Sequence, residues 1–173
     1  NHHLVRLYRD TLDVQPYIRY RPLPQVLGEI QGLLARYRGI TTFIFDDDLF
    51  TFNREYLQEF CREYPRISRL PFVVNAHVLR FGPEEARALK AAGCCLVKFG
   101  LESGSPRVRR EVLHRNMGND QIVLALARCR EAGLPSSTFV MFGLPTETRA
   151  EMEETVELLA VSRPDRARWT YFF

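Results

Sequence analysis

The 173-residue sequence is poor in lysine and has neither a long apolar run nor a metal-binding cysteine pattern. No stretch approaches the roughly 18 consecutive apolar residues of a membrane-spanning helix, and the start of the sequence has no signal-peptide pattern. Of 24 basic residues only Lys90 and Lys98 are lysines. These absences argue against membrane and secreted classes, and we expect a soluble, cytoplasmic protein.

Charge is nearly balanced. The formal net charge of +3 comes from 24 basic and 21 acidic residues spread along the chain. The summed field is therefore weak, and we expect no nucleic-acid partner. With 46% hydrophobic and 26% charged residues, the composition fits one globular domain over residues 1–173.

Four cysteines sit within apolar stretches, which predicts reduced thiols in the core of a cytosolic protein. They are Cys61, Cys94, Cys95 and Cys129. None has the spacing of a metal site, and neighbours in a strand such as Cys94 and Cys95 point to opposite faces. No metal ligand is therefore assigned in this sequence.

Short apolar runs alternate with helical patterns along the chain. The runs predict strands at 42–45, 72–75, 95–99, 138–142 and 169–172. Helix signals begin at Pro24, at Asn53, at Pro83, at Asn119 or Asp120, and at Thr148. The first four end at Gly39, Pro65, Gly93 and Gly133. Repeated strand–helix units predict a parallel α/β sheet, either open and doubly wound or part of a barrel.

The helix after Thr148 has a capping box, in which Thr148 pairs with Glu151. Its apolar spacing predicts that Met152, Val156 and Leu159 are buried. The sequence begins with a helical segment rather than a strand, so we expect it to come from a longer polypeptide.

Polar residues follow each predicted strand, where parallel α/β folds bind ligands. Three carboxylates, Asp46 to Asp48, favour a bound cation or ammonium group, although a solvated turn also fits. Asn75 and His77 follow the second strand, and a structural role suits His77 better than that of a base.

Glycines border the next two strand ends. The segment from Gly100 to Ser105 presents Glu102 and Ser103 between glycines, which suits ligand hydroxyls or an ammonium group. Gly143 leads into a stiff loop against which a flat ring can lie. Arg109 and Arg115 follow the third strand, where Arg is suited to clamping a carboxylate. For Arg109 a solvated surface position is the better prediction.

These stretches together resemble the radical S-adenosylmethionine (SAM) superfamily, most closely the group in which a cobalamin-binding domain precedes the radical domain. The similarity follows the family's order and spacing at 17–21, 45–51, 92–94, 99–105, 112–115, 132–134 and 142–148. It implies a partial, TIM-like (β/α)6 barrel that lacks its first strand and holds strands two to six. The family's Cys-x3-Cys-x2-Cys loop, which binds a [4Fe-4S] cluster, is absent from this sequence.

The resemblance also implies a SAM site. Asp47 and Asp48 resemble the motif that receives the methionine amino group, and Asn75 lies where relatives have a polar residue near the ribose. Glu102 and Ser103 resemble a pair that faces SAM, and Arg115 resembles the partner of the methionine carboxylate. The stretch from Met141 to Gly143 resembles the strand along the adenine.

The implied chemistry is reductive cleavage of SAM to a 5′-deoxyadenosyl radical, which abstracts hydrogen from a small-molecule or peptide substrate. The cofactors would be SAM, a [4Fe-4S] cluster with ligands outside this sequence, and cobalamin if a separate domain carries it. A flavodoxin or ferredoxin would supply the electron.

Two alternatives remain open at this stage. A degenerate barrel that binds or scaffolds without catalysis fits the missing cysteines. A haloacid-dehalogenase-like phosphatase would use Asp46 as nucleophile, Asp48 as acid-base and Mg²⁺. That chemistry needs a later Lys and a second acidic pair at a strand end, and no such pair follows.

Overall fold

The computed structural model of the protein describes residues 7, 10, 11, 19–47 and 50–173. Asp48, one of the predicted ligand-binding residues, lies outside them. The chain forms two compact units that divide after Arg36. The first contains helix α2 (Leu23–Arg36), which overlaps the helix predicted from Pro24 and ends before Gly39. The second contains the sheet.

Five strands form one parallel sheet in the order β1-β2-β3-β4-β5. They are β1 (Phe43–Phe45), β2 (Phe72–Ala76), β3 (Cys94–Glu102), β4 (Ser136–Phe142) and β5 (Arg166–Tyr171). Spatial order equals chain order, so each right-handed crossover moves in the same direction and returns on the same face. This topology is that of a barrel wall. In a doubly wound sheet the order would reverse part-way.

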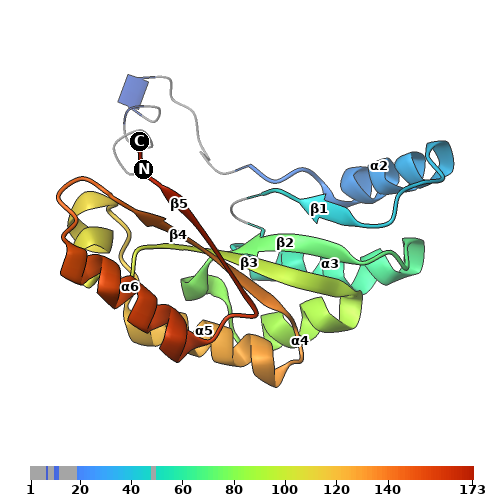
Figure 1. The fold of residues 1–173 in the computed structure, drawn as a ribbon. Coiled ribbons are helices and arrows are strands. Elements are labelled where there is room, and N and C mark those ends of the chain that lie inside the picture. Colours follow the sequence, from blue (N-terminus) through green and yellow to red (C-terminus); the bar gives the residue numbers. More distant parts are fainter. Residues whose placement is uncertain (1–6, 8–9, 12–18, 48–49) are drawn as a thin grey trace. The chain divides into compact units, whose positions relative to one another are not determined.

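Helices α3 to α6 lie along one face of this sheet (Figure 1). They are α3 (Arg54–Ile67), α4 (Pro83–Ala92), α5 (Asn119–Glu131) and α6 (Arg149–Ser162), with a 3-10 turn η1 (Val78–Arg80) and a π-helical turn η2 (Val108–Val112). The predicted start signals hold: Asn53 accepts a hydrogen bond from the Tyr56 amide, and Thr148 forms its capping box with Glu151. Pro65 lies inside the last turn of α3, two residues before the helix ends.

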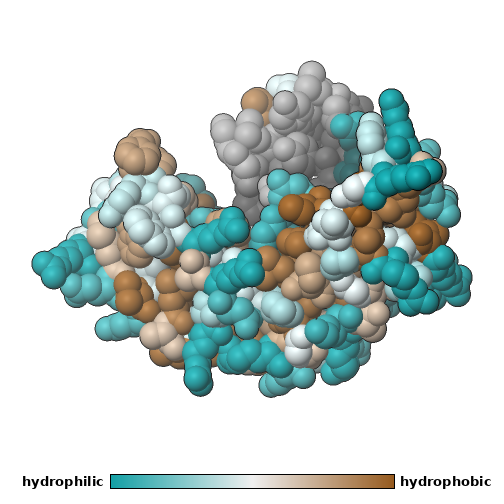
Figure 2. Space-filling view, turned by 45° about the vertical axis from the view of Figure 1, so that its right-hand side comes forward, coloured by the Kyte–Doolittle hydropathy of each residue, from teal (hydrophilic) through white to brown (hydrophobic). Residues whose placement is uncertain are grey.

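The core fills the space between the sheet and these helices. Phe45, Phe60, Tyr64 and Phe72 pack there edge-to-face or stacked, with ring centroids 4.8–6.3 Å apart. Such pairs stabilise a core beyond the area they bury. On the face shown in Figure 2, hydrophilic and hydrophobic residues are interspersed, in keeping with charge that is spread along the sequence.

Three cysteines are buried as predicted, and the fourth is not. Burial raises the pKa of Cys61, Cys94 and Cys129 to about 12, so their thiols stay protonated and unreactive. Cys95 is exposed, so its assignment to the core was wrong. The β2–β3 pairing shifts register at the start of β3 and skips Cys95, so simple alternation does not apply there and Cys94 is buried while Cys95 is exposed.

The buried stripe of α6 also differs from the prediction. Val156 is 57% exposed, whereas Glu151, Thr155 and Leu158 are buried. Polar contacts explain the rotation. The Glu151 carboxylate accepts hydrogen bonds from Arg107 at 2.6 and 2.9 Å, and the Thr155 hydroxyl accepts one from the Gly104 amide at 2.7 Å. The helix therefore buries a polar edge against the loop that follows β3.

Among the described residues, no helix combines the length and apolar character needed to cross a membrane.

Candidate functional site

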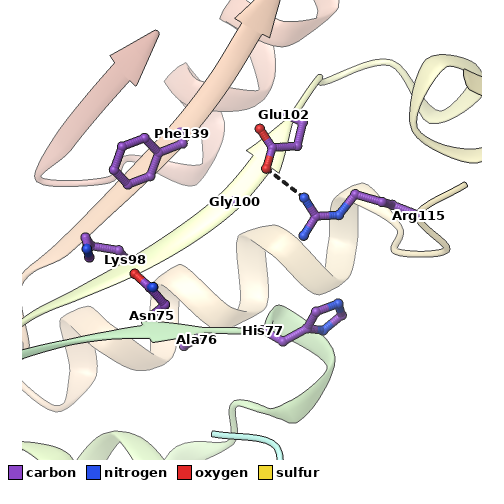
Figure 3. A pocket seen from close by; sticks show the side chains of 8 residues that line it. All are labelled: Asn75, Ala76, His77, Lys98, Gly100, Glu102, Arg115 and Phe139. Carbon is purple, nitrogen blue, oxygen red and sulfur yellow. Dashed lines mark hydrogen bonds and ion pairs between the residues drawn. The ribbon is translucent and has the colours of Figure 1, made fainter. Parts of the chain in front are cut away.

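A cavity of about 360 Å³ opens on the face of the sheet opposite α3 to α6 (Figure 3). It lies across β2, β3 and β4 toward their carboxyl ends, where this class of fold binds ligands. Its lining combines cationic, anionic, amide and aromatic side chains: Asn75, Ala76, His77, Lys98, Gly100, Glu102, Arg115 and Phe139.

Glu102 and Arg115 form an ion pair at one side of the cavity. Arg115 Nη1 lies 2.7 Å from Glu102 Oε1, and the two side chains are 33% and 21% exposed. Glu102 ends β3 with a φ of 65°, and the β3–β4 register shifts between Gly100 and Glu102. A bulge of this kind re-aims a side chain. The strained residue therefore carries the charged group at the cavity, where a structural cost can serve ligand binding.

A second charged cluster consists of Asp46, Asn75 and Lys98. Asp46 Oδ1, at the end of β1, accepts hydrogen bonds from Asn75 Nδ2 at 3.1 Å and from Lys98 Nζ at 3.3 Å. These contacts, that of Asn75 first, lower the pKa of the Asp46 carboxyl. Asn75 and Lys98 are register partners on β2 and β3, so pairing brings the amide and the ammonium group to one carboxylate.

His77 has the structural role that the sequence favoured, and its ring also lines the cavity. Its Nδ1 accepts a hydrogen bond from the Leu79 amide at 3.3 Å and so caps η1, while its ring lines the cavity. Burial lowers the pKa of the imidazole, and the charges of Arg115 and Arg80 lower it further. A neutral ring whose Nδ1 is an acceptor carries its proton on Nε2, so His77 is a hydrogen-bond donor.

Glu147 connects the two loops at the ends of β3 and β4. Its Oε2 accepts hydrogen bonds from the amides of Gly143 at 2.7 Å and Leu144 at 3.1 Å, and its Oε1 accepts one from the Ser103 hydroxyl at 3.3 Å. Gly143 has a φ of +79°, a conformation that favours glycine. The carboxylate thus fixes the shape of the Gly143 loop.

Arg109 was expected at the solvated surface, and this expectation was wrong: the residue is fully buried. Its guanidinium donates hydrogen bonds to the carbonyl oxygens of Ser103 at 2.6 Å and Met117 at 3.2 Å, and to the side chain of Asn119. Arg109 itself is part of the turn η2. Burial lowers the pKa of the guanidinium, and the carbonyl dipoles compensate the buried charge.

The predicted site residues occupy different positions around the cavity. Asn75, Glu102 and Arg115 line it. Ser103 is fully buried, and its hydroxyl contacts Glu147. Three others lie outside the cavity lining: Met141, which is half-buried on β4, and Gly143 and Asp47, which are exposed.

Sequence reasoning overlooked Lys98, Phe139 and Glu147 as parts of the site. The two strand residues carried a usable signal. Side chains alternate between the two faces of a strand, so Gly100 and Lys98 lie on the same face as Glu102 at the strand's end. The role of Glu147 had no such signal, because it depends on how the loops after β3 and β4 approach each other.

Comparison with known sequences identifies the family. The sequence model of the radical SAM superfamily matches residues 8–159. The chain belongs to this superfamily. Membership of this superfamily argues against the phosphatase hypothesis, in which Asp46 is the nucleophile. In the structure, the Asp46 carboxylate accepts hydrogen bonds from Asn75 and Lys98.

Two curated relatives match most of the chain. An uncharacterized methyltransferase of Pyrococcus horikoshii is 29% identical over 153 residues, which are 88% of this chain and 33% of the relative. The anaerobic magnesium-protoporphyrin IX monomethyl ester cyclase of Cereibacter sphaeroides is 27% identical over 161 residues, which are 89% of this chain and 26% of that enzyme. The chain thus spans about a third or less of these relatives.

Solved structures show the radical SAM fold. The methyltransferase TsrM from Kitasatospora setae, with cobalamin and a [4Fe-4S] cluster bound, matches with a TM-score of 0.76 at 23% identity, covering 87% of this chain and 29% of that one. The coproporphyrinogen III oxidase HemN from Escherichia coli matches with a TM-score of 0.70 at 15% identity, covering 87% and 37%. The predicted TIM-like barrel architecture is confirmed.

The residues of this chain fit SAM but not an iron–sulfur cluster. Within the described residues, no group of three or more His, Cys, Asp or Glu side chains could hold a metal. Three of the four cysteines are buried. The cavity, in contrast, presents a carboxylate, a guanidinium and an amide, which match the charged and hydroxyl groups of SAM.

Proposed function

We propose that this chain is the SAM-binding core of a radical SAM enzyme. One observation carries the proposal: the strained end of β3 presents Glu102 to the cavity, and Arg115 pairs with it there. The pair is half-buried and lies at the ligand-binding end of the barrel, and this placement fits a role in binding.

Different side chains bind different parts of SAM. Arg115 donates a hydrogen bond from Nη1 to Glu102 and retains other N–H donors for the methionine carboxylate. Asn75 lies on the ribose side, and the region of Asp47 and Asp48 receives the amino group. Met141 and the Gly143 loop border the adenine. Ser103 supports this loop through Glu147 rather than by contact with the ligand.

The chain's role in catalysis is to orient SAM and shield the site from water. In this family, SAM bound with a reduced [4Fe-4S] cluster supplies the 5′-deoxyadenosyl radical. The cluster ligands are not residues of this sequence, and a flavodoxin or ferredoxin serves as electron donor. The names of the relatives include methyl transfer and ring closure, so both reaction classes are candidates, with cobalamin as a further cofactor for the first.

Binding of SAM to the complete, cluster-reconstituted enzyme tests the proposal. Calorimetry should show that Arg115→Ala weakens SAM binding by about 1.5–3 kcal/mol, because a charge-assisted contact to a carboxylate is lost. Arg110→Ala is the matched control, since Arg110 follows the same strand and forms an exposed ion pair with its neighbour Glu111.

Two outcomes contradict the proposal. If Arg115→Ala binds SAM as tightly as the Arg110 control does, the assignment of Arg115 is wrong. If the unaltered enzyme does not bind SAM, the domain is the non-catalytic scaffold that the sequence also allowed.

A further inference from the structure

A row of basic side chains extends from the cavity across β4 to β5. Phe139 lines the cavity, and Arg168 is its register partner on β5, with the guanidinium 5.8 Å from the centre of the Phe139 ring. Arg166 lies two residues earlier in β5 and therefore on the same face. Lys98 lines the same cavity from β3 (Figure 3). We call Lys98, Phe139, Arg166 and Arg168 the basic wall.

The basic wall has an excess of positive charge. Arg166 and Arg168 form no ion pair with any residue that the structure describes. The Lys98 side chain is 19% exposed, and its counter-ion Asp46, 3.3 Å away, is 80% exposed. The other residues on this face of β4 and β5 are uncharged, namely Ser137, Met141 and Thr170. Arg166 and Arg168 are exposed, whereas Lys98 and Phe139 are half-buried. This imbalance of charge favours an anion.

The wall also has a flat, apolar part. Phe139 lines the cavity together with Lys98, and its register partner Gly100 has no side chain. A ring in the cavity can stack on Phe139, while its acidic group reaches Arg168 or Lys98. Arg is suited to this combination, because its planar guanidinium both stacks on aromatic rings and binds carboxylates.

We propose that the basic wall binds the substrate, and that the substrate is an aromatic carboxylate. This inference rests on the proposed function only in calling the ligand a substrate. Two residues of the wall, Lys98 and Phe139, line the same cavity as Glu102 and Arg115, so a ring held on Phe139 is next to the proposed SAM site. Specificity for the acid follows from the cationic groups of Lys98, Arg166 and Arg168, of which only Lys98 has a counter-ion among the described residues.

Binding of two matched probes to the complete enzyme tests the proposal. 2-Naphthoate and the uncharged 2-naphthamide share one ring system and differ in charge. Calorimetry should show that the acid binds at least about tenfold more tightly than the amide. Arg168→Gln and Lys98→Gln should each remove most of this preference, and Phe139→Ala should weaken both probes. Arg149→Gln is the control, because Arg149 lies on α6, across the sheet, and is 93% exposed.

The outcomes separate this proposal from that of SAM binding. Equal affinity for acid and amide, or an unchanged preference in both Arg168→Gln and Lys98→Gln, overturns the basic wall as a substrate site. If Arg168→Gln does not fold, Arg168→Lys and Lys98→Gln decide. SAM affinity in Arg168→Gln should stay within about twofold of the unaltered enzyme, because Arg168 is not among the residues that line the cavity. Loss of SAM binding in the unaltered enzyme, with the probe preference intact, would contradict only the proposed function.

Discussion

A Cβ atom on Gly100 would lie 2.5 Å from Oε1 of Glu102 and 3.3 Å from Nη1 of Arg115. The ion pair therefore occupies the space that a side chain at position 100 would need. Gly100 is required here for close approach, since no positive φ demands it.

Gly100→Ala should displace the Glu102 carboxylate without unfolding the protein, because the atoms it meets are the ends of flexible side chains. We expect SAM affinity to fall by about tenfold, as for the loss of one charged hydrogen bond, with a nearly unchanged melting temperature. Gly28→Ala is the control, since nothing lies within 4 Å of its added Cβ. Calorimetry and thermal unfolding measure the two effects, and unchanged SAM affinity would contradict the prediction.

Arg109→Met should reduce the free energy of unfolding by about 2–4 kcal/mol, because the buried carbonyl oxygens of Ser103 and Met117 lose their donors. Urea unfolding measures the change. Arg110→Met, one residue along the same turn and exposed, should alter stability by less than about 0.5 kcal/mol. Equal stability of the two variants would show that the Arg109 hydrogen bonds are dispensable.

His77 should make stability depend on pH. Its folded-state pKa is lowered from the ordinary value of 6.5, so the unfolded chain takes up the proton first as pH falls. The contribution of His77 is therefore fully present above about pH 6.5 and is lost as pH falls toward the folded-state pKa. Urea unfolding of the wild type and His77→Gln between pH 8 and 5 should show their difference in stability shrinking on acidification. A constant difference would argue against this.

Much of the architecture could be predicted because it depends on local signals. Apolar runs mark β1 to β4, and Asn53, Gly93 and Thr148 mark helix ends through hydrogen bonds or backbone conformations within a few residues. The positions of Asn75 and Glu102 at strand ends followed from the same alternation. These features need no knowledge of distant contacts.

Two of the errors involve polar contacts that lie outside the element concerned. Arg109 is buried because the carbonyl of Met117 and the side chain of Asn119 fold back over it. The stripe of α6 is rotated because Glu151 and Thr155 contact the loop after β3. In both cases a polar group that usually faces water finds its partner inside the protein, which hydrophobic spacing alone does not reveal.

The contacts of Glu147 have a mechanical consequence. One carboxylate restrains the segment after β4 through two amides and the segment after β3 through a hydroxyl. A displacement of either segment therefore breaks hydrogen bonds that hold the other. The segments after β3 and β4 consequently move together rather than one at a time. Movement of the Gly143 loop is coupled in this way to the geometry of the strand that carries Glu102.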